Sequence, residues 1–239
     1  HLSAIATGVR VVAFAQAEPK SRWSLHDIAT SAKKDGAGYV LNGHKAVVIG
    51  APQADHLLVS ARTGGSQREA KGVSLFLAPK SAKGISTRDY PTMDGSRASE
   101  VYFENVALGA EHLVGPADAA LPVIERIVDE ANAAFAHEAV GCMRMMTSLT
   151  QEYSRTRKQF GRAIAEFQVL QHRLVDMFMA TEESVSMALL ATLKLDAGGA
   201  ERTKAVSAAK VSIGRAARFV GQAAVQTHGG MGVTDEMRV

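Results

Sequence analysis

The hydrophobic period of this chain changes once, near residue 120, and that change limits the folds open to it. Before this point apolar residues gather in short runs separated by turn-forming residues, as in β-strands. After it they recur every three or four residues, as on one face of a helix. The 239 residues, 46% of them hydrophobic, are enough to fill two cores. We therefore expect an α+β chain, with a β-rich domain over residues 1–118 and a helical domain over residues 119–239.

The β-rich half is predicted to form an antiparallel domain resembling a barrel or a sandwich. The strongest hairpin signal is Asn42-Gly43, which lies between two apolar stretches. Further turn chemistry occurs at Asp35-Gly36, Gly64-Gly65-Ser66 and Asp94-Gly95. The expected strands are 9–15, 39–41, 46–49, 56–61, 73–78 and 100–103.

The second half predicts three long helices over residues 121–154, 164–197 and 201–228. The breaks between them are short, a turn over Lys158 to Gly161 and the pair Gly198-Gly199. Because short connections favour antiparallel neighbours, we expect an up-and-down bundle.

Composition excludes several classes of protein. The 27 Lys and Arg nearly balance the 24 Asp and Glu, and no basic block is long enough to follow a nucleic acid, so we expect no nucleic-acid partner. The single cysteine, Cys142, cannot form an internal disulfide and has no companions at metal spacing, which favours a cytoplasmic location and no bound metal. No apolar run approaches the roughly 20 residues of a membrane span, so we expect a soluble protein.

A basic segment from Arg155 to Arg162 follows the first predicted long helix. Its cations can complement the negative end of the helix dipole, with Gly161 ending the helix. The same residues can serve a ligand, because Arg157 offers a planar fork for a phosphate and Phe160 an apolar wall for a purine. The segment alone leaves both interpretations open.

A glycine-rich segment, Gln226-Thr227-His228-Gly229-Gly230-Met231-Gly232, ends the last predicted helix. The glycines can be an ordinary helix stop. They can also let a pyrophosphate approach the backbone N–H groups, with the Gln226 amide as an added donor. A histidine beside such glycines is more often structural than a catalytic base.

A third segment, Phe14-Ala15-Gln16-Ala17-Glu18-Pro19, indicates a strand followed by a turn. Together with four others in order, it resembles the acyl-CoA dehydrogenase family. These are Tyr-Val-Leu-Asn-Gly-His-Lys at 39–45, Ala-Asp at 54–55, Arg-Lys-Gln-Phe-Gly-Arg at 157–162 with Phe-Gln-Val-Leu-Gln at 167–171, and Ala-Val-Gln-Thr-His-Gly-Gly-Met-Gly-Val-Thr at 224–234. The resemblance covers nearly the whole chain. It is closest to members that look like pimeloyl-CoA dehydrogenase small subunits, because residues 18–22 read Glu-Pro-x-Ser-Arg.

The resemblance implies an FAD cofactor between the two domains, with its adenosine end reached by a neighbouring subunit. Carried over by position, Arg157 would contact the FAD phosphates, Gln226 and Gly230 would hold the pyrophosphate, and Phe160 and Gln168 would line the adenine side. At the flavin-ring end the corresponding positions are Phe14, Gln16 and Ala17. Because some of these contacts cross a subunit interface in the family, a homo- or hetero-oligomer, dimer or tetramer, is implied.

The flavin-ring end departs from the family pattern. Ala17 lacks the hydroxyl that hydrogen-bonds the isoalloxazine in most members, which leaves the backbone N–H groups for that contact. Val47-Val48-Ile49 replaces Trp-Ile-Thr, and this removes an indole and a second hydroxyl. Each lost hydrogen bond is worth about 0.5 to 1.5 kcal/mol net, so flavin binding would survive with altered electronics. Trp23 stands where many members have a serine that contacts the CoA portion.

The implied reaction is α,β-dehydrogenation of an acyl-CoA thioester, in which a carboxylate removes the α-proton and the β-hydrogen leaves as hydride to the flavin. The base of most members would fall beyond Val239, and the base position of a minority falls at Ala131. Glu130 and Glu138 are near, but an offset of one residue turns a helical side chain by about 100°. We therefore assign no catalytic residue.

The chain is expected to be truncated at both ends and inactive by itself. It starts at His1 rather than Met, its helical domain is incomplete, and it lacks the N-terminal helical domain of the resembled family.

Three hypotheses for the function remain open. In the first, the chain belongs to an FAD-dependent acyl-CoA dehydrogenase of fatty acid β-oxidation that passes electrons to an electron-transfer flavoprotein. In the second, suggested by Ala17, Val47 and Ile49, it is a non-catalytic subunit that completes the FAD site of a partner. In the third, it is a related oxidase of acyl-CoA or nitroalkanes. The residues do not reveal the acyl chain, the electron acceptor or the stoichiometry.

Overall fold

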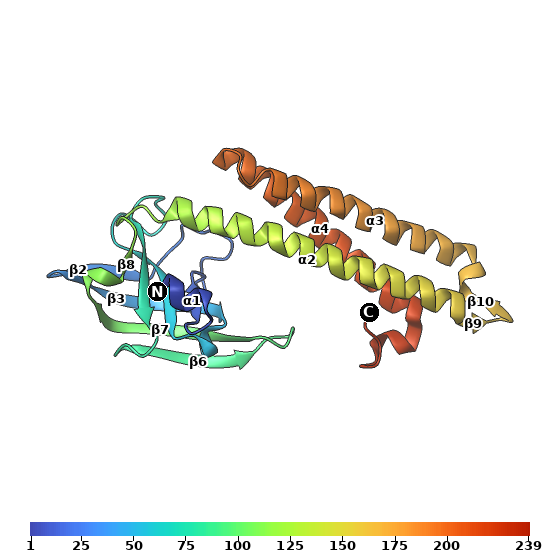
Figure 1. Ribbon diagram of the computed structural model, residues 1–239, viewed down its shortest axis with the longest axis horizontal. Coiled ribbons are helices and arrows are strands. Elements are labelled where there is room, and N and C mark those ends of the chain that lie inside the picture. Colours follow the sequence, from blue (N-terminus) through green and yellow to red (C-terminus); the bar gives the residue numbers. More distant parts are fainter. The chain divides into compact units, whose positions relative to one another are not determined.

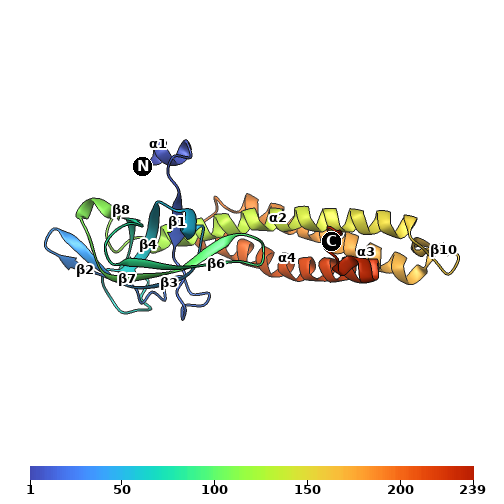
Figure 2. The same cartoon turned by 90° about the horizontal axis from the view of Figure 1, so that it is seen from below.

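The computed structural model describes residues 1–239, which form two compact units, His1–Glu125 and Arg126–Val239. The first unit is built on one eight-stranded sheet with the order β6-β7-β3-β2-β4-β5-β8, and β1 pairs with β4 (Figure 2). Its elements are α1 (Leu2–Ala6), β1 (Val12–Ala15), β2 (Ser31–Asp35), β3 (Gly38–Ile49), β4 (His56–Arg62), β5 (Val73–Pro79), β6 (Ile85–Pro91), β7 (Arg97–Leu108) and β8 (Leu113–Val114), with 3-10 turns η1 (Ala51–Gln53) and η2 (Ala110–His112).

The α+β fold class is confirmed, and the sheet is mixed. Most neighbouring strands are antiparallel, but β1 runs parallel to β4, and β2 meets β4 through one parallel pair, Ser31 with Arg62. The sheet folds around a core of aliphatic side chains with Phe76 and Phe103, and the Phe76 ring meets the Tyr39 ring edge-on at a centroid distance of 5.0 Å. Burying this apolar surface is the main favourable contribution to folding of the unit.

The hairpin predicted at Asn42-Gly43 is wrong, because β3 continues through both residues. The turn between β2 and β3 lies at Gly36-Ala37, where Gly36 has a φ of +54°. Asn42 uses its side chain across the sheet instead, since its amide oxygen accepts a hydrogen bond from the Asn105 N–H at 2.8 Å. Gly43 is needed for close packing, because a Cβ there would lie 2.4 Å from Oγ1 of Thr30.

Three long helices make up most of the second unit and lie side by side, as predicted (Figure 1). They are α2 (Leu121–Thr156), whose first turn belongs to the first unit, α3 (Gln168–Leu193) and α4 (Gly199–His228). The connection from α2 to α3 is a small hairpin of β9 (Lys158–Gln159) and β10 (Arg162–Ala163) followed by the 3-10 turn η3 (Ile164–Glu166). This connection starts α3 four residues later than predicted. A last 3-10 turn, η4 (Gly229–Val233), follows α4.

Small and medium side chains fill the core of the helical unit. Ala133 and Ala136 of α2, Ala188 and Ala191 of α3, and Ala209 of α4 are buried there together with Met143, Met177, Ile213 and Val220. A buried ion pair also joins α4 to α2, with Nε of Arg202 2.9 Å from Oδ2 of Asp129. Short side chains let the helix backbones approach closely, as ridge-and-groove packing requires.

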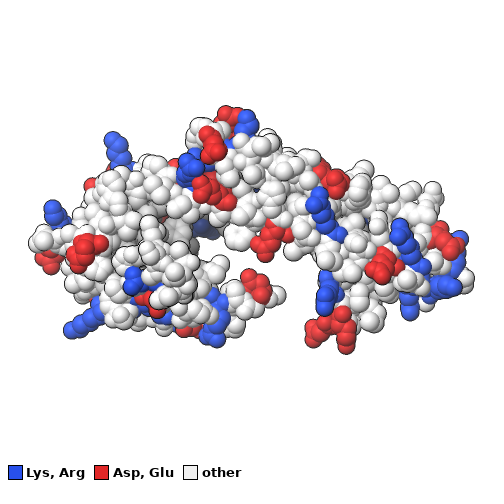
Figure 3. Space-filling model, in the orientation of Figure 1, with Lys and Arg blue, Asp and Glu red and all other residues white.

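No helix of either unit is both long enough and apolar enough to cross a bilayer. On the face shown in Figure 3, Lys and Arg are interspersed with Asp and Glu, and wide areas carry no charge. This face presents no continuous basic track of the kind that follows a nucleic-acid backbone.

Candidate functional site

A hollow of about 490 Å³ opens in the helical unit where the end of α2, the β9–β10 hairpin, the start of α3 and the end of α4 meet. Four of the eight residues predicted to bind the cofactor line it together: Arg157, Phe160, Gln226 and Gly230. The rest of the lining is Tyr153, Gln159, Ile164, Phe167, Val169, Leu170, Arg173, Thr227, His228 and Gly229. Segments that are some 70 residues apart in sequence thus share one concave surface.

The charge of this hollow suits an anion. Two guanidinium groups, those of Arg157 and Arg173, line it, and the lining contains no carboxylate. Neither arginine forms a salt bridge, although Arg173 is half-buried. An arginine with its planar set of donors free is well matched to a phosphate group. Arg173 had no signal in the sequence that set it apart from other basic residues on helices.

The glycines at the end of α4 differ in how much space the chain leaves for a side chain. Gly232 is needed for packing, since a Cβ there would lie 2.6 Å from the carbonyl oxygen of Val225. A Cβ at Gly230 would meet no atom within 4 Å. Nothing in the chain itself therefore requires glycine at position 230, and its bare backbone is open to a group arriving from outside.

Phe160 stands at the tip of the β9–β10 hairpin and is 91% exposed. It has a φ of +56° and Gly161 a φ of +82°, the pair of positive values typical of a two-residue hairpin turn. A bulky residue in this region costs roughly 1 to 3 kcal/mol. Its ring approaches the Phe167 ring edge-on at a centroid distance of 6.1 Å, so one wall of the hollow is aromatic. Gln168 is exposed beside this wall but does not line the hollow.

His228 is enclosed between the ends of two helices and is 2% exposed. Its Nδ1 lies 2.9 Å from the carbonyl oxygen of Ala224 and must donate, because a carbonyl only accepts. The ring packs on Tyr153 at a centroid distance of 4.3 Å, and the Tyr153 hydroxyl donates to the His228 carbonyl oxygen at 3.4 Å. These contacts tie the end of α4 to the end of α2.

The end of β1 and the residues that follow it hold the three residues predicted for the flavin-ring end, and this segment is hydrogen-bonded to β3. Phe14 and Gln16 are half-buried, whereas Ala17 is exposed. The Ala46 N–H donates to the Ala17 carbonyl oxygen at 2.9 Å, and Nζ of Lys45 donates to the Gln16 carbonyl oxygen at 3.1 Å. The structure thus places Gln16 and Ala17 beside the β3 segment that the sequence comparison linked to them.

Val47 on β3 is strained. It has a φ of +52°, which is an outlier for a β-branched residue, and it lies in a bulge of the β3–β7 pairing. Its N–H donates to Oε1 of Glu100 at 3.4 Å, and Oε2 of Glu100 lies 2.6 Å from Nε2 of His44. Burial alone raises the pKa of Glu100, but hydrogen bonds from Tyr90, His44 and the Val47 backbone lower it overall. Strain of this kind is concentrated at functional sites.

The candidate base positions hold no group poised for proton abstraction. Ala131 cannot take a proton, and Oε1 of Glu130 accepts from Nε of Arg126 at 2.8 Å, one turn away on the same helix. Glu138 is exposed on α2.

The fold has two units, a β-sheet unit and a helical unit, and the hollow of the helical unit is lined by two arginines without an acidic partner. Residues 13–106 match the family model for the middle domain of acyl-CoA dehydrogenases, and residues 121–239 match the model for their C-terminal domain. The chain belongs to the acyl-CoA dehydrogenase family.

Two curated relatives and one solved structure illustrate the similarity. A 3-(aryl)acrylate reductase of Clostridium sporogenes is 28% identical, with 100% of this chain and 64% of the relative covered. A mitochondrial isovaleryl-CoA dehydrogenase of Oryza sativa is 30% identical, with 99% and 58% covered. The FAD complex of PigA superposes with a TM-score of 0.91 at 27% identity, covering 99% of this chain and 62% of that one. The chain therefore spans less than two thirds of the length of these relatives.

Proposed function

We propose that this chain is the middle and C-terminal part of an FAD-dependent acyl-CoA dehydrogenase. The observation that carries the proposal is the hollow of the helical unit, where Arg157, Gln226 and the open Gly230 backbone meet without a carboxylate. A diphosphate is the anionic group that such a set of donors fits best. The relatives named as dehydrogenases, and the FAD complex of PigA, support the same choice.

FAD fits the residues present. Arg157 would hold its phosphates, Gln226 and Gly230 would hold its pyrophosphate, and Phe160 and Gln168 would lie on the adenine side. Phe14, Gln16 and Ala17 would serve the ring end, where Ala17 can offer only its backbone. When bound, the flavin supplies a hydride acceptor for the β-hydrogen of the substrate.

The residues of this chain would bind and orient, while the base would be the carboxylate at the family's usual position, which falls beyond Val239. The substrate is an acyl-CoA thioester, and its α-proton goes to that base. The electrons leave to an electron-transfer flavoprotein, and the protein works as an oligomer whose subunits complete the cofactor site. We place it in the cytoplasm, which the single cysteine and relatives from bacteria support. The Glu-Pro-x-Ser-Arg sequence at 18–22 favours the subfamily of pimeloyl-CoA dehydrogenase small subunits.

A second function is favoured by the flavin-ring end. Ala17, Val47 and Ile49 lack the hydroxyls and the indole expected there, while the phosphate end is intact. A subunit that completes the FAD site of a catalytic partner would show this combination. The residue at the family's base position, which falls after Val239, distinguishes the two functions. A glutamate there favours the enzyme, and its absence favours the non-catalytic subunit.

The test is purification of the full-length protein followed by assay with a panel of acyl-CoA thioesters and an artificial electron acceptor. We expect a yellow protein that reduces the acceptor. A yellow protein without turnover, active only with a partner subunit, would establish the second function. Oxygen consumption without an acceptor would indicate an oxidase, and a colourless protein that turns over no acyl-CoA would overturn the flavoprotein proposal.

A further inference from the structure

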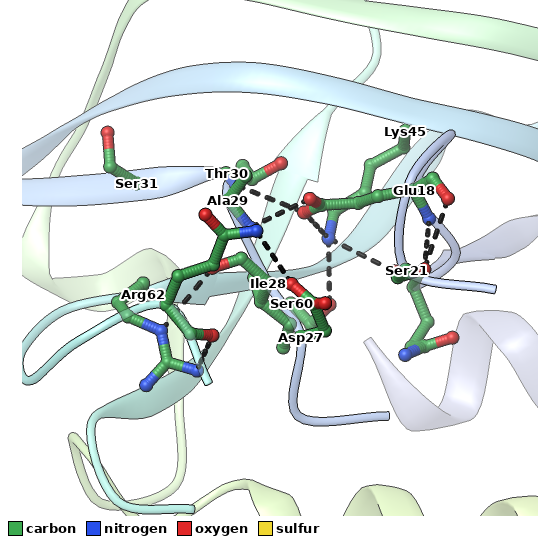
Figure 4. Close-up of polar contacts among 12 residues, drawn as sticks. Glu18, Ser21, Asp27, Ile28, Ala29, Thr30, Ser31, Lys45, Ser60 and Arg62 are labelled. Atoms are coloured by element: carbon green, nitrogen blue, oxygen red, sulfur yellow. Dashed lines mark hydrogen bonds and ion pairs between the residues drawn. The ribbon is translucent and has the colours of Figure 1, made fainter. Parts of the chain in front are cut away.

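A lysine is enclosed in the first unit and uses every hydrogen-bond donor that it has. The side chain of Lys45 on β3 is 0% exposed. Its Nζ donates to Oε1 of Glu18 at 2.8 Å, to Oγ of Ser60 at 3.0 Å and to the Gln16 carbonyl oxygen at 3.1 Å (Figure 4). An ammonium group has three donors, so this one is fully satisfied. Burial lowers the pKa of Lys45 to about 8, and the opposing charge of Glu18 limits this shift.

Glu18 is fastened from the other side as well. Its Oε2 accepts from the Ala29 N–H at 2.7 Å, and its Oε1 accepts from the Thr30 N–H at 3.0 Å (Figure 4). Its carboxylate is 6% exposed. The segment from Gln16 to Glu18 is therefore held by β3 and by the residues that lead into β2, while Ser60 of β4 helps to fix Lys45.

The residue between the two fastened positions is exposed. Ala17 gives its carbonyl oxygen to the Ala46 N–H, while its own N–H has no protein partner. Since alanine carries no polar side-chain atom, any polar contact with a ligand at this position depends on where the backbone points. An ordinary apolar pair would pack the interior at less cost, because a buried ion pair must offset the desolvation of two charges.

We propose that Lys45 and Glu18 are positioning residues that orient the Ala17 backbone N–H toward the flavin ring of FAD. This inference rests on the proposed function. In place of a side-chain hydroxyl, the chain uses a buried ion pair to fix the direction of one backbone donor. A single hydrogen bond to the ring influences the electronic state of the flavin. If Lys45 and Glu18 served only to pack the interior, their replacement would leave that electronic state unchanged.

The test compares variants of the full-length holoenzyme. Lys45→Met and Glu18→Gln break the ion pair, and Lys45→Arg keeps a buried cation. Arg202→Met is the matched control, because it breaks an ion pair of similar length that belongs to the helical unit and involves no residue of the first unit. The readouts are the visible absorption spectrum of the flavin, its midpoint potential, the affinity for FAD and the melting temperature.

We expect Lys45→Met and Glu18→Gln to shift the flavin spectrum and potential and to weaken FAD binding roughly two- to tenfold, the worth of one hydrogen bond. Lys45→Arg should restore part of the shift, and Arg202→Met should lower the melting temperature only. If Lys45→Met does not fold, Ser60→Ala removes one acceptor of Lys45 and should give a smaller shift of the same sign.

Unchanged flavin spectra and potentials in variants that are merely less stable would overturn the positioning role and leave the proposed function intact. A wild-type protein that binds no flavin would overturn both.

Discussion

Two arginines line the hollow of the helical unit without an acidic partner, and this makes them the residues most sensitive to the identity of the ligand. Arg157 lies at the end of α2 and Arg173 in α3, half-buried. A half-buried cation gives up part of its hydration and gains nothing from a carboxylate in return. An anionic ligand would supply the missing partner for both groups.

Replacing Arg173 by Met is therefore expected to weaken FAD binding about tenfold or more, because a hydrogen bond to a charged group contributes about 1.5 to 3 kcal/mol. Fluorescence titration of the full-length apoprotein with FAD measures this. Arg144→Met is the control, since Arg144 is exposed on α2 and lines no part of the hollow. Equal losses in the two variants would show that only overall charge matters.

Glu18 makes the stability of the first unit depend on pH. Burial raises the pKa of Glu18, but the charge of Lys45 and hydrogen bonds from Lys45, Thr30 and Ala29 lower it below 4.5 overall. A carboxyl with a lowered pKa stabilises the fold above its unfolded pKa, and this contribution is lost as the pH falls through the folded value. We expect Glu18→Gln to cost about 3 kcal/mol at pH 7.

That difference should shrink as the pH is lowered from 5 towards 3. Urea denaturation of wild type and Glu18→Gln across this range measures it. A difference that stays constant with pH would contradict this account of Glu18.

The sequence predicted Arg157, Gln226 and Gly230 as cofactor-binding residues because each stands in a motif of ordered spacing, and the three line one hollow. It did not identify Arg173, since one arginine on a helix surface looks like any other until α3 packs against α4. The positive φ of Val47 was equally hidden. A β-branched residue predicts a regular strand, and only the bulge opposite β7 and the Glu100 carboxylate determine otherwise.

At the scale of elements, close packing and not local turn chemistry determines the conformation of Asn42-Gly43. Asn42-Gly43 has the composition of a hairpin turn, yet the backbone continues as β3 because Thr30 packs against the glycine and Asn105 pairs with the asparagine. The helices were predictable because a period of 3.6 residues persists through each of them. The start of α3 was less predictable, since η3 takes residues 164–166, which the helical period assigned to the second long helix.

Gly43→Ala is expected to destabilise the first unit by about 2 kcal/mol, because the new methyl group would lie 2.6 Å from Cα of Thr30, which is backbone and cannot move aside. Gly214→Ala in α4, where a Cβ meets no atom within 4 Å, should instead stabilise by about 0.5 to 1 kcal/mol. Thermal denaturation followed by circular dichroism distinguishes the two signs. A tolerated Gly43→Ala would place Thr30 further from β3 than the structure has it.

At the scale of the whole molecule, the chain has two separate cores that share no residue. The change of hydrophobic period near residue 120 predicts this, because strands of period 2 and helices of period 3.6 bury their apolar sides in different ways. Damage to one core should therefore remain in its own unit.

Arg202→Met tests this separation. Removing one partner of the buried pair with Asp129 should cost about 3 to 5 kcal/mol in the helical unit. Hydrogen exchange should accelerate at amides of α3 and α4 and stay unchanged in β3, β4 and β7. Faster exchange throughout the sheet as well would mean that the two units unfold as one.

Gly230 and Gly232 stand two residues apart, yet folding alone requires glycine only at position 232. The backbone around Gly232 leaves no room for a methyl group, so every folded descendant of this chain must keep glycine there. At Gly230 the chain has room for a larger residue, so a requirement for glycine there would come from the proposed cofactor. A mutational library of the full-length protein sorted for expression should accumulate alanine and serine at position 230. The same library sorted for bound flavin should lose these residues.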